Sequence, residues 1–300
     1  MVGSRDNGQQ TKESFAAKWK DSPQILFDPA VAFRSGILSW VLARNGFVDV
    51  EQLRSFLNSK TRILDAGCGN GRMIELFCSY ASADVEIVGI DINADIAQSN
   101  LGGKDNVIVY SRDLLNDLSD LGGFDFIYCQ EVLHHTTDPV LGVKRLAKQL
   151  NPGGILAVYV YRVKAPLREF SDDLVRSSFE SRSWEDAYEE ASRITALGKT
   201  LSEITATVSV PDIPVLGIRE GQYSLQRFFY HFFLKCFWSP ELSVKDNIAI
   251  NLDWFHPSIA TRHTLDEVRD WMALVDLDVI HAVEDEYGIT VHGQRTKEMS

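Results

Sequence analysis

The sequence predicts an α/β protein with a doubly wound, mostly parallel sheet of seven strands, to which N-terminal helices and a helical insertion are added. Residues 63–72 combine a β-favouring pair, an acid and glycine at every second position, and a helical pattern follows them directly. Short runs rich in Val and Ile then recur, with helix-length intervals between them. Alternation of strands and helices along a chain is typical of parallel sheets with helical connections.

Each element of this sheet has its own signal. Residues 151–154 read Asn-Pro-Gly-Gly and predict a turn before the fifth strand, and residues 264–267 form a capping box at the start of the last helix. That helix carries apolar residues at 268, 271, 272 and 275, the spacing of a packed face. The expected strands are residues 63–65, 85–91, 107–110, 124–129, 155–161, 278–283 and 288–293.

The glycine turn carries Gly67, Gly69 and Gly71. A dinucleotide fingerprint needs its third glycine one residue later, where Arg72 stands, and the Gly-Lys-Ser/Thr ending of a phosphate-binding loop is absent. We expect the turn to bring free N–H groups at a helix N-terminus close to a ligand. The spacing favours neither a dehydrogenase nor a nucleoside triphosphatase.

Acidic residues follow two further strands at matching places. Asp91 ends the second strand, where an acid can accept both hydroxyls of a ribose, and Asp113 comes shortly after the third. Each acid alone is more often a cap at the end of a strand. Their order along the chain favours a nucleoside-binding site.

The pattern from Asp65 through Gly71, Asp-x-Gly-x-Gly-x-Gly, resembles the first motif of the class I S-adenosylmethionine-dependent methyltransferases. The resemblance covers residues 61–161, resumes at residue 264, and is to the small-molecule type with a helical insertion before the last core helix. It implies a Rossmann-like methyltransferase fold and S-adenosylmethionine as cofactor, with Asp113 at the adenine amino group and Leu114 against the ring. The cofactor residues that it implies are Asp65, Gly67, Cys68, Gly69, Gly71, Arg72, Asp91, Ile92, Asp113, Leu114, Gln130 and His135.

Four regions are expected along the chain: a helical cover at 1–60, the cofactor-binding core at 61–161, the insertion or substrate cap at 162–263, and the last helix with the closing strands at 264–300. The cover contains Phe15 and Trp19 and two apolar helical stretches, residues 31–43 and 48–57. Arg34 is read as an exposed flank residue or as a partner for a carboxylate.

The insertion changes character along its length. Residues 170–205 are charged and helical in pattern, whereas residues 227–238 hold seven aromatic side chains. So many aromatics exceed one helical stripe and predict a helix that is apolar around most of its circumference. The segment is read as the core of a helical cap, as the wall of a pocket for an apolar or aromatic substrate, or as a contact face for a second subunit.

Histidines supply the candidate bases, because imidazole titrates near neutral pH. His256 and His263 precede the last helix, at the end of the sheet where ligands of doubly wound folds bind, and they are predicted to contact the substrate together with Asp253 and Trp254. The catalytic candidates are His256, His263 and His135. In the family that the chain resembles, the second histidine of this Glu-x-Leu-His-His segment commonly lines the cofactor pocket.

Composition narrows the function classes. The formal net charge of −12 opposes binding to a polyanion, so no nucleic-acid partner is expected. The four cysteines lack the spacing of a zinc site or a disulfide framework, and no metal is predicted. We expect a cytoplasmic protein, because the sequence shows neither a signal pattern nor an apolar run that would span a membrane.

The leading hypothesis is an S-adenosylmethionine-dependent methyltransferase that acts on a small molecule, with an oxygen acceptor favoured over nitrogen or carbon. One alternative is a methyltransferase of RNA or protein. A second is a non-catalytic binding or scaffold subunit that keeps the fold. A homodimer is also considered, through the aromatic segment.

Overall fold

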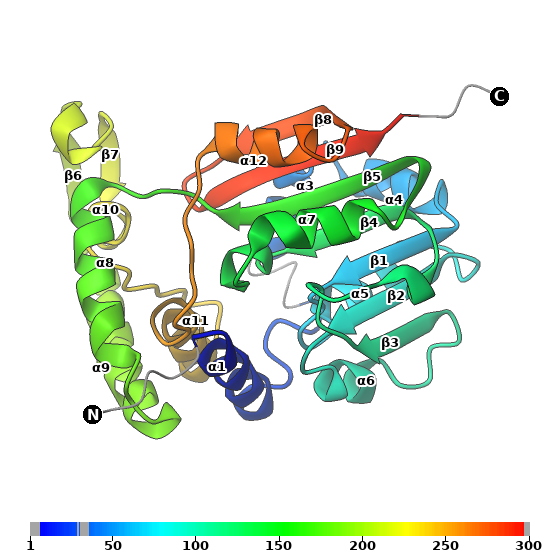
Figure 1. Ribbon diagram of the computed structural model, residues 1–300. Helices are drawn as coiled ribbons and strands as arrows, with labels where there is room; N and C mark the ends of the chain where they lie inside the picture. The colour runs from blue at the N-terminus through cyan, green and yellow to red at the C-terminus, as the bar shows by residue number, and fades with distance from the viewer. Residues whose placement is uncertain (1–6, 29, 31–35, 297–300) are drawn as a thin grey trace. The chain divides into compact units, whose positions relative to one another are not determined.

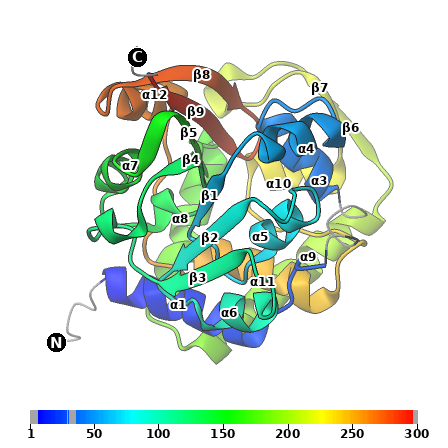
Figure 2. The same cartoon turned by 90° about the vertical axis from the view of Figure 1, so that its right-hand side faces the viewer.

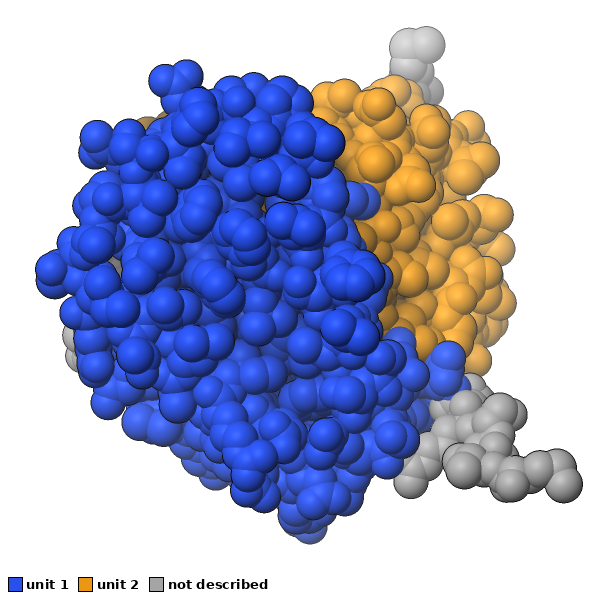
Figure 3. Space-filling view, turned by 90° about the vertical axis from the view of Figure 1, so that its left-hand side faces the viewer, with its two compact units in different colours: residues 1–22, 163–258 blue, residues 23–162, 259–300 orange. Residues whose placement is uncertain are grey.

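The computed structural model describes residues 7–28, 30 and 36–296. The chain divides into two compact units, which Figure 3 shows in different colours. We call Met1–Ser22 with Val163–Ser258 the insertion unit, and Pro23–Arg162 with Ile259–Ser300 the sheet unit. The N-terminal segment that ends at Ser22 thus groups with the insertion, whereas residues 23–60 group with the sheet.

The sheet unit contains a seven-stranded sheet of order β3-β2-β1-β4-β5-β9-β8 (Figure 1). The pairs among β1 to β5 are parallel, whereas β9 runs antiparallel to both β5 and β8. This arrangement confirms the predicted fold class. The strands are β1 (Arg62–Ala66), β2 (Glu86–Asp91), β3 (Val107–Ser111), β4 (Phe124–Gln130), β5 (Leu150–Tyr161), β8 (Leu277–Glu284) and β9 (Gly288–Arg295).

Helices cover both faces of this sheet, and each face has its own apolar layer (Figure 2). One layer includes side chains of α7 and α12, and the other includes side chains of α3, α4, α5 and α6. The helices are α3 (Ile37–Arg44), α4 (Val50–Asn58), α5 (Arg72–Cys78), α6 (Asp95–Leu101), α7 (Pro139–Ala147) and α12 (Leu265–Ala273), with short 3₁₀ turns at Ser119–Leu121 and Leu133–His135. The strands read as apolar runs because both faces of a parallel sheet are buried.

Local signals in the sheet unit are confirmed with shifted boundaries. The capping box at Thr264 is present in both halves, since Thr264 Oγ1 accepts from the Glu267 N–H and the Glu267 carboxylate accepts from the Thr264 N–H. Strand β5 begins at Leu150, before the expected turn, and its pairing with β4 is irregular there. The expected helix at 31–43 lies partly outside the described residues, as does Arg34.

The insertion unit is mainly helical and adds a two-stranded hairpin that the sequence analysis did not predict. Its elements are α1 (Asn7–Asp21), α8 (Pro166–Phe179), α9 (Trp184–Glu203), β6 (Thr207–Val210), a 3₁₀ turn at Pro214–Leu216, β7 (Gly221–Ser224), α10 (Leu225–Phe232) and α11 (Val244–Phe255). No helix among the described residues has the length and apolar character needed to cross a membrane.

Helix α10 ends at Phe232, so the expectation of one apolar helix through residue 238 is wrong. The side chain of Asn251 holds the chain beyond the helix, because it accepts a hydrogen bond from the Phe237 N–H at 2.8 Å and donates to the Phe237 carbonyl at 2.9 Å. These bonds satisfy backbone groups that a longer helix would have paired internally. Several aromatic rings of the segment pack on one another, for example Phe228 on Phe233 at 5.5 Å.

Candidate functional site

The glycine turn between β1 and α5 is the first part of the site. Gly67, Gly69 and Gly71 have φ angles of 85°, 55° and 87°, in the left-handed region where glycine is favoured. A Cβ added to Gly67 would lie 2.2 Å from Cγ2 of Val132. One added to Gly71 would lie 2.6 Å from Cδ1 of Leu101. The turn therefore needs glycine for its backbone angles and for its close packing.

Several N–H groups of this turn bond within the sheet unit, so the expectation of free N–H groups does not hold for Gly67, Cys68, Gly69 and Gly71. The N–H groups of Gly67 and Cys68 both donate to the Ile90 carbonyl, at 2.7 and 3.0 Å. The Gly69 N–H donates to Oδ2 of Asp91 at 2.9 Å. The parallel pairing of β1 with β2 brings the turn against the end of β2, which supplies these acceptors.

Asp91 stands at the end of β2, as predicted for an acid that binds a ribose. Its Oδ2 accepts from the Gly69 N–H and its Oδ1 accepts from the Asn93 N–H at 2.8 Å. Asp91 is half-buried, as is Ile92. A carboxylate oxygen can accept more than one hydrogen bond, so the two printed bonds do not by themselves exclude a role of Asp91 in binding ligand hydroxyls.

Asp65 is buried beneath the turn at the end of β1. Among the described residues, its Oδ2 has no hydrogen-bond partner. The pKa of Asp65 is raised to about 7, mainly because burial disfavours its charged form. The Arg72 charge opposes this shift, and the Asp91 charge adds to it. A buried carboxyl oxygen without a partner is costly, and a cationic amine of a ligand would offset that cost. Cys68, beside it, is buried as well, and burial raises the pKa of its thiol.

Glu131 belongs to this site although the sequence analysis did not select it. It follows β4, has a φ of 60°, and its carboxylate lies 2.8 Å from Nη2 of Arg72 at the start of α5. Positive φ in a residue with a Cβ is uncommon and often marks a functional position. The ion pair joins the glycine turn to the segment after β4, and nothing in the sequence pattern around Glu131 signals its backbone angle.

The other predicted cofactor residues lie after β3 and at the end of β4. Asp113 accepts from the Leu115 N–H at 3.0 Å. Leu114 is buried in the apolar layer that includes α7. Gln130 accepts a hydrogen bond from the Tyr128 hydroxyl.

Asn70 holds the segment at residues 23–27 against the glycine turn. Its side-chain amide is fully buried and donates to the carbonyls of Ile25, at 3.0 Å, and Pro23, at 3.2 Å. Asn100 adds bonds to the carbonyls of Pro23 and Asn70, both at 3.0 Å. The only sequence signal for this role of Asn70 is its place between two glycines of the turn, which does not indicate its partners.

His134 and His135 form a short stack after β4. The ring of His134 lies 3.7 Å from the ring of Tyr161 and 4.3 Å from that of His135. Nδ1 of His135 is 2.7 Å from the Ile259 carbonyl, so this nitrogen carries the proton and donates. In the neutral ring Nε2 then holds the lone pair, which is the state that a general base requires.

His263 belongs to the sheet unit, next to α12. Its ring lies 4.6 Å from that of Trp271, and Nε2 is 2.8 Å from Oγ1 of Thr261. Burial lowers the pKa of His263, and Glu267 opposes that shift. The residue also lies directly before the helix cap, so it packs at the start of α12.

Asp253, Trp254 and His256 belong to the insertion unit and have partners inside it. Lys18 lies 2.8 Å from the Asp253 carboxylate. Nε1 of Trp254 donates to Asp172 at 2.9 Å. His256 is buried, with Nδ1 2.8 Å from Ser14 Oγ. The predicted substrate set is thus divided between the two units.

Residues 57–204 match a family model described as a methyltransferase domain. An uncharacterised protein of Synechococcus sp. is 37% identical over 131 residues, which are 41% of this chain and 31% of that protein. A ubiquinone biosynthesis O-methyltransferase of Azorhizobium caulinodans is 31% identical over 153 residues, which are 49% of this chain and 58% of that protein. The chain therefore spans less than two thirds of the length of either relative.

A solved structure with a similar fold is also known. The structure of PKMT2 from Rickettsia typhi superposes with a TM-score of 0.53 at 14% sequence identity, covering 80% of this chain and 49% of that chain. At this identity the likeness concerns the fold. The family match gives residues 57–204 as a methyltransferase domain, and the likeness in fold agrees with the doubly wound order of the sheet.

Proposed function

We propose that this protein is an S-adenosylmethionine-dependent methyltransferase that acts on a small molecule, with an oxygen acceptor favoured. The observation that carries the proposal is the side-chain set around the glycine turn. Asp65 offers a buried carboxyl oxygen to a cationic amine, and Asp91 offers a half-buried carboxylate to a pair of hydroxyls. S-adenosylmethionine has both groups, and the residues present fit it.

Each predicted cofactor residue then has a role. Gly67, Gly69 and Gly71 are proposed to shape the turn beside the ligand, because their positive φ angles favour glycine and the Cβ positions of Gly67 and Gly71 are filled by Val132 and Leu101. Asp113 and Leu114 are proposed to bind the base. The other proposed cofactor residues are Cys68, Arg72, Ile92, Gln130 and His135.

The chemistry asks little of the protein. Bound S-adenosylmethionine supplies an electrophilic methyl group. The protein has to orient the acceptor, exclude water and, for a hydroxyl acceptor, take up its proton. Among the three catalytic candidates we favour His135, because its hydrogen bond to Ile259 leaves Nε2 as the proton acceptor. His256 and His263 are proposed to act by packing or by contact with the substrate, together with Asp253 and Trp254.

The assignment of a small-molecule substrate is supported by the similarity to the ubiquinone biosynthesis O-methyltransferase, a protein whose name states an oxygen acceptor. A cytoplasmic location is supported by the four cysteines, all of which are free. An apolar or aromatic acceptor and a homodimer stay predictions from the aromatic segment at residues 227–238.

Calorimetry tests the cofactor assignment. S-adenosylmethionine and S-adenosylhomocysteine should bind with micromolar dissociation constants, equivalent to about −8 kcal/mol. Tighter binding of NADH than of both would overturn the proposal. Transfer of a labelled methyl group to a panel of catechols and other phenols then tests catalysis, and His135→Gln should lower the rate more than it lowers cofactor affinity.

A further inference from the structure

Several cationic side chains of the insertion unit gather around one ring. Lys235 Nζ lies 4.8 Å from the centre of the Trp254 ring, Arg168 Cζ lies 5.3 Å from it and Lys164 Nζ lies 5.8 Å from it. Lys235 and Arg168 are buried and Lys164 is half-buried. Such a group is unexpected in a chain of net charge −12.

A second ring extends this group to Arg227. The Cζ atoms of Arg168 and Arg227 lie 4.7 and 5.5 Å from the centre of the Tyr230 ring. Arg168 therefore contacts both rings and links them into one cluster. We call Lys164, Arg168, Arg227 and Lys235 the cation cluster.

The buried acid of this region is already used. Oδ2 of Asp172 accepts from Arg168 Nε at 2.7 Å and from Trp254 Nε1 at 2.9 Å. Oδ1 accepts from the backbone N–H of Lys235 at 2.9 Å. Asp172 thus balances the charge of Arg168 and fixes two neighbours through their N–H groups.

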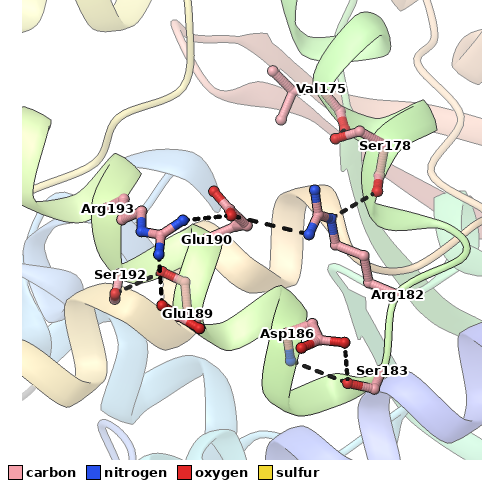
Figure 4. A network of polar contacts seen from close by, with 9 residues as sticks. All are labelled: Val175, Ser178, Arg182, Ser183, Asp186, Glu189, Glu190, Ser192 and Arg193. Carbon is pink, nitrogen blue, oxygen red and sulfur yellow. Dashed lines mark hydrogen bonds and ion pairs between the residues drawn. The ribbon is translucent and has the colours of Figure 1, made fainter.

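Arg227 stands apart from the other arginines of this unit. Its Nη1 is buried and has no hydrogen-bond partner among the described residues. Arg193 on α9 shows the contrast, because its guanidinium bonds to Glu189 at 2.6 Å and to Glu190 at 2.7 Å (Figure 4). A guanidinium N–H that is buried without an acceptor is costly, and an anionic ligand would remove that cost.

The electrostatic potential beside Arg227 supports the same conclusion. Burial, together with Arg168, Arg227 and Lys164, lowers the pKa of His231 to about 3. Arg168, Arg227 and Lys164 are all cations, and each lowers the pKa of this ring. His231 is therefore neutral at physiological pH.

We propose that Lys164, Arg227 and Lys235 form a binding site for an anionic group, a carboxylate or a phosphate, of a small-molecule ligand. The fork of Arg227 suits either group, because a guanidinium can donate two parallel hydrogen bonds to a carboxylate or a phosphate. Lys164 and Lys235 add charge without that geometry. The inference goes beyond methyl transfer, since anion binding requires neither the methyl donor nor a reaction.

Calorimetry with the full-length protein tests the site, with inorganic phosphate and sodium benzoate as separate probes at constant ionic strength. We expect saturable binding of at least one probe, and the tighter one identifies the anion class. Arg227→Gln should raise its dissociation constant about tenfold or more, because it removes a charge-assisted pair. Arg193→Gln, the same change on an exposed arginine of the same unit, should leave the constant unchanged.

Circular dichroism establishes that each variant is folded. If Arg227→Gln does not fold, Lys164→Gln carries the same prediction at a half-buried position, with a smaller increase in the dissociation constant. The proposal is overturned if neither probe binds saturably to the wild-type protein. It is equally overturned if Arg227→Gln and Arg193→Gln change the affinity to the same extent.

Discussion

Among the described residues, the insertion unit buries more polar side chains than the sheet unit, although it is the smaller of the two. The sheet unit has two continuous apolar layers, one on each face of its sheet. The insertion unit buries Arg168, Asp172 and Arg176, and each of them bonds to other buried groups. Further buried polar residues of the insertion unit are Gln10, Thr11, Ser14, Ser22, Thr195, Gln226, Lys235, Asn247, Asn251 and His256.

This difference predicts how the two units respond to substitution. Apolar layers tolerate exchange among residues of similar size, whereas a buried polar group needs its own partner. Arg176, for example, donates from Nη2 to the Pro257 carbonyl at 2.6 Å and from Nη1 to the Trp254 carbonyl, which fixes the chain at the end of α11. We therefore expect single polar substitutions to affect the insertion unit more than the sheet unit.

The largest effect is expected for Asp172→Ala. The change leaves the Arg168 guanidinium buried without its acid and removes the acceptor of Trp254 Nε1. Breaking a buried ion pair on one side costs about 3–5 kcal/mol. Urea unfolding should show this loss of free energy of unfolding, whereas Asp173→Ala, the exposed neighbouring acid, should change it by less than about 0.5 kcal/mol.

A double variant refines this prediction. Removing both charges with Arg168→Met and Asp172→Leu should recover part of the lost free energy of unfolding, because the cost arises from an unpaired buried charge. If the double variant is less stable than Asp172→Ala, the two side chains act through separate contacts. The polar core of the insertion unit would then be a set of independent bonds.

The sheet unit should respond most strongly at Gly67. A Cβ added to Gly67 would lie 2.2 Å from the Val132 side chain, and the φ angle of Gly67 is 85°. Gly67→Ala therefore combines overpacking with backbone strain. We expect a loss of about 2–5 kcal/mol in free energy of unfolding. Gly103→Ala is the matched control, because its φ is 89° and nothing lies within 4 Å of the added Cβ. Only the strain, about 1–2 kcal/mol, should remain there.

Most of the sheet unit could be predicted from sequence, because its strands are apolar runs, its turn has a defined glycine spacing and its last helix has a capping box. The insertion unit could not be predicted to the same depth. The course of the chain after α10 involves Asn251, and the environment of Arg168 includes Trp254. Those partners are distant in sequence, and periodicity carries no information about such pairs.

The site shows the same limit within the sheet unit. Asp65 and Asp91 can be proposed from the sequence because acids at strand ends follow a pattern. Glu131 and Asn70 were missed because their roles depend on a backbone angle and on the carbonyls of residues 23–27. The acceptors of the N–H groups in the turn, Ile90 and Asp91, also depend on the register of β1 against β2, which the sequence does not give.

The next prediction concerns the affinity for the cofactor and not the free energy of unfolding. Asp91→Ala should raise the dissociation constant of S-adenosylhomocysteine about 10- to 100-fold, because charge-assisted hydrogen bonds to the ribose are lost. Asp95→Ala removes an exposed acid of the same region and should leave the constant unchanged. Calorimetry measures both variants. Equal affinities for wild type and Asp91→Ala would show that Asp91 has a structural role, for example through the Gly69 and Asn93 N–H groups, and does not bind the ribose.

A pH effect is expected at Asp65. Its folded pKa, about 7, lies above the ordinary value of 3.8, so the folded state binds a proton more tightly than the unfolded state. The contribution of Asp65 protonation to the free energy of unfolding is therefore fully present below about pH 4. It decreases by up to about 1.4 kcal/mol per pH unit as the pH rises to about 7. Unfolding without cofactor at several pH values measures it. Asp65→Asn should flatten the curve in this window, and an unchanged curve would contradict the prediction.

The smallest effects compare helix caps in the two units. Ser183 caps α9, where its Oγ accepts from the Asp186 N–H at 3.1 Å and donates to the Asp186 carboxylate at 2.9 Å (Figure 4). Thr264 caps α12 with a capping box in the sheet unit. Ser183→Ala and Thr264→Ala should each cost about 1 kcal/mol. If the units unfold separately, calorimetry shows two transitions and each variant lowers the midpoint of only one. If both variants shift a single transition equally, the two units unfold together. The difference between their cores would then not make the two units independent in unfolding.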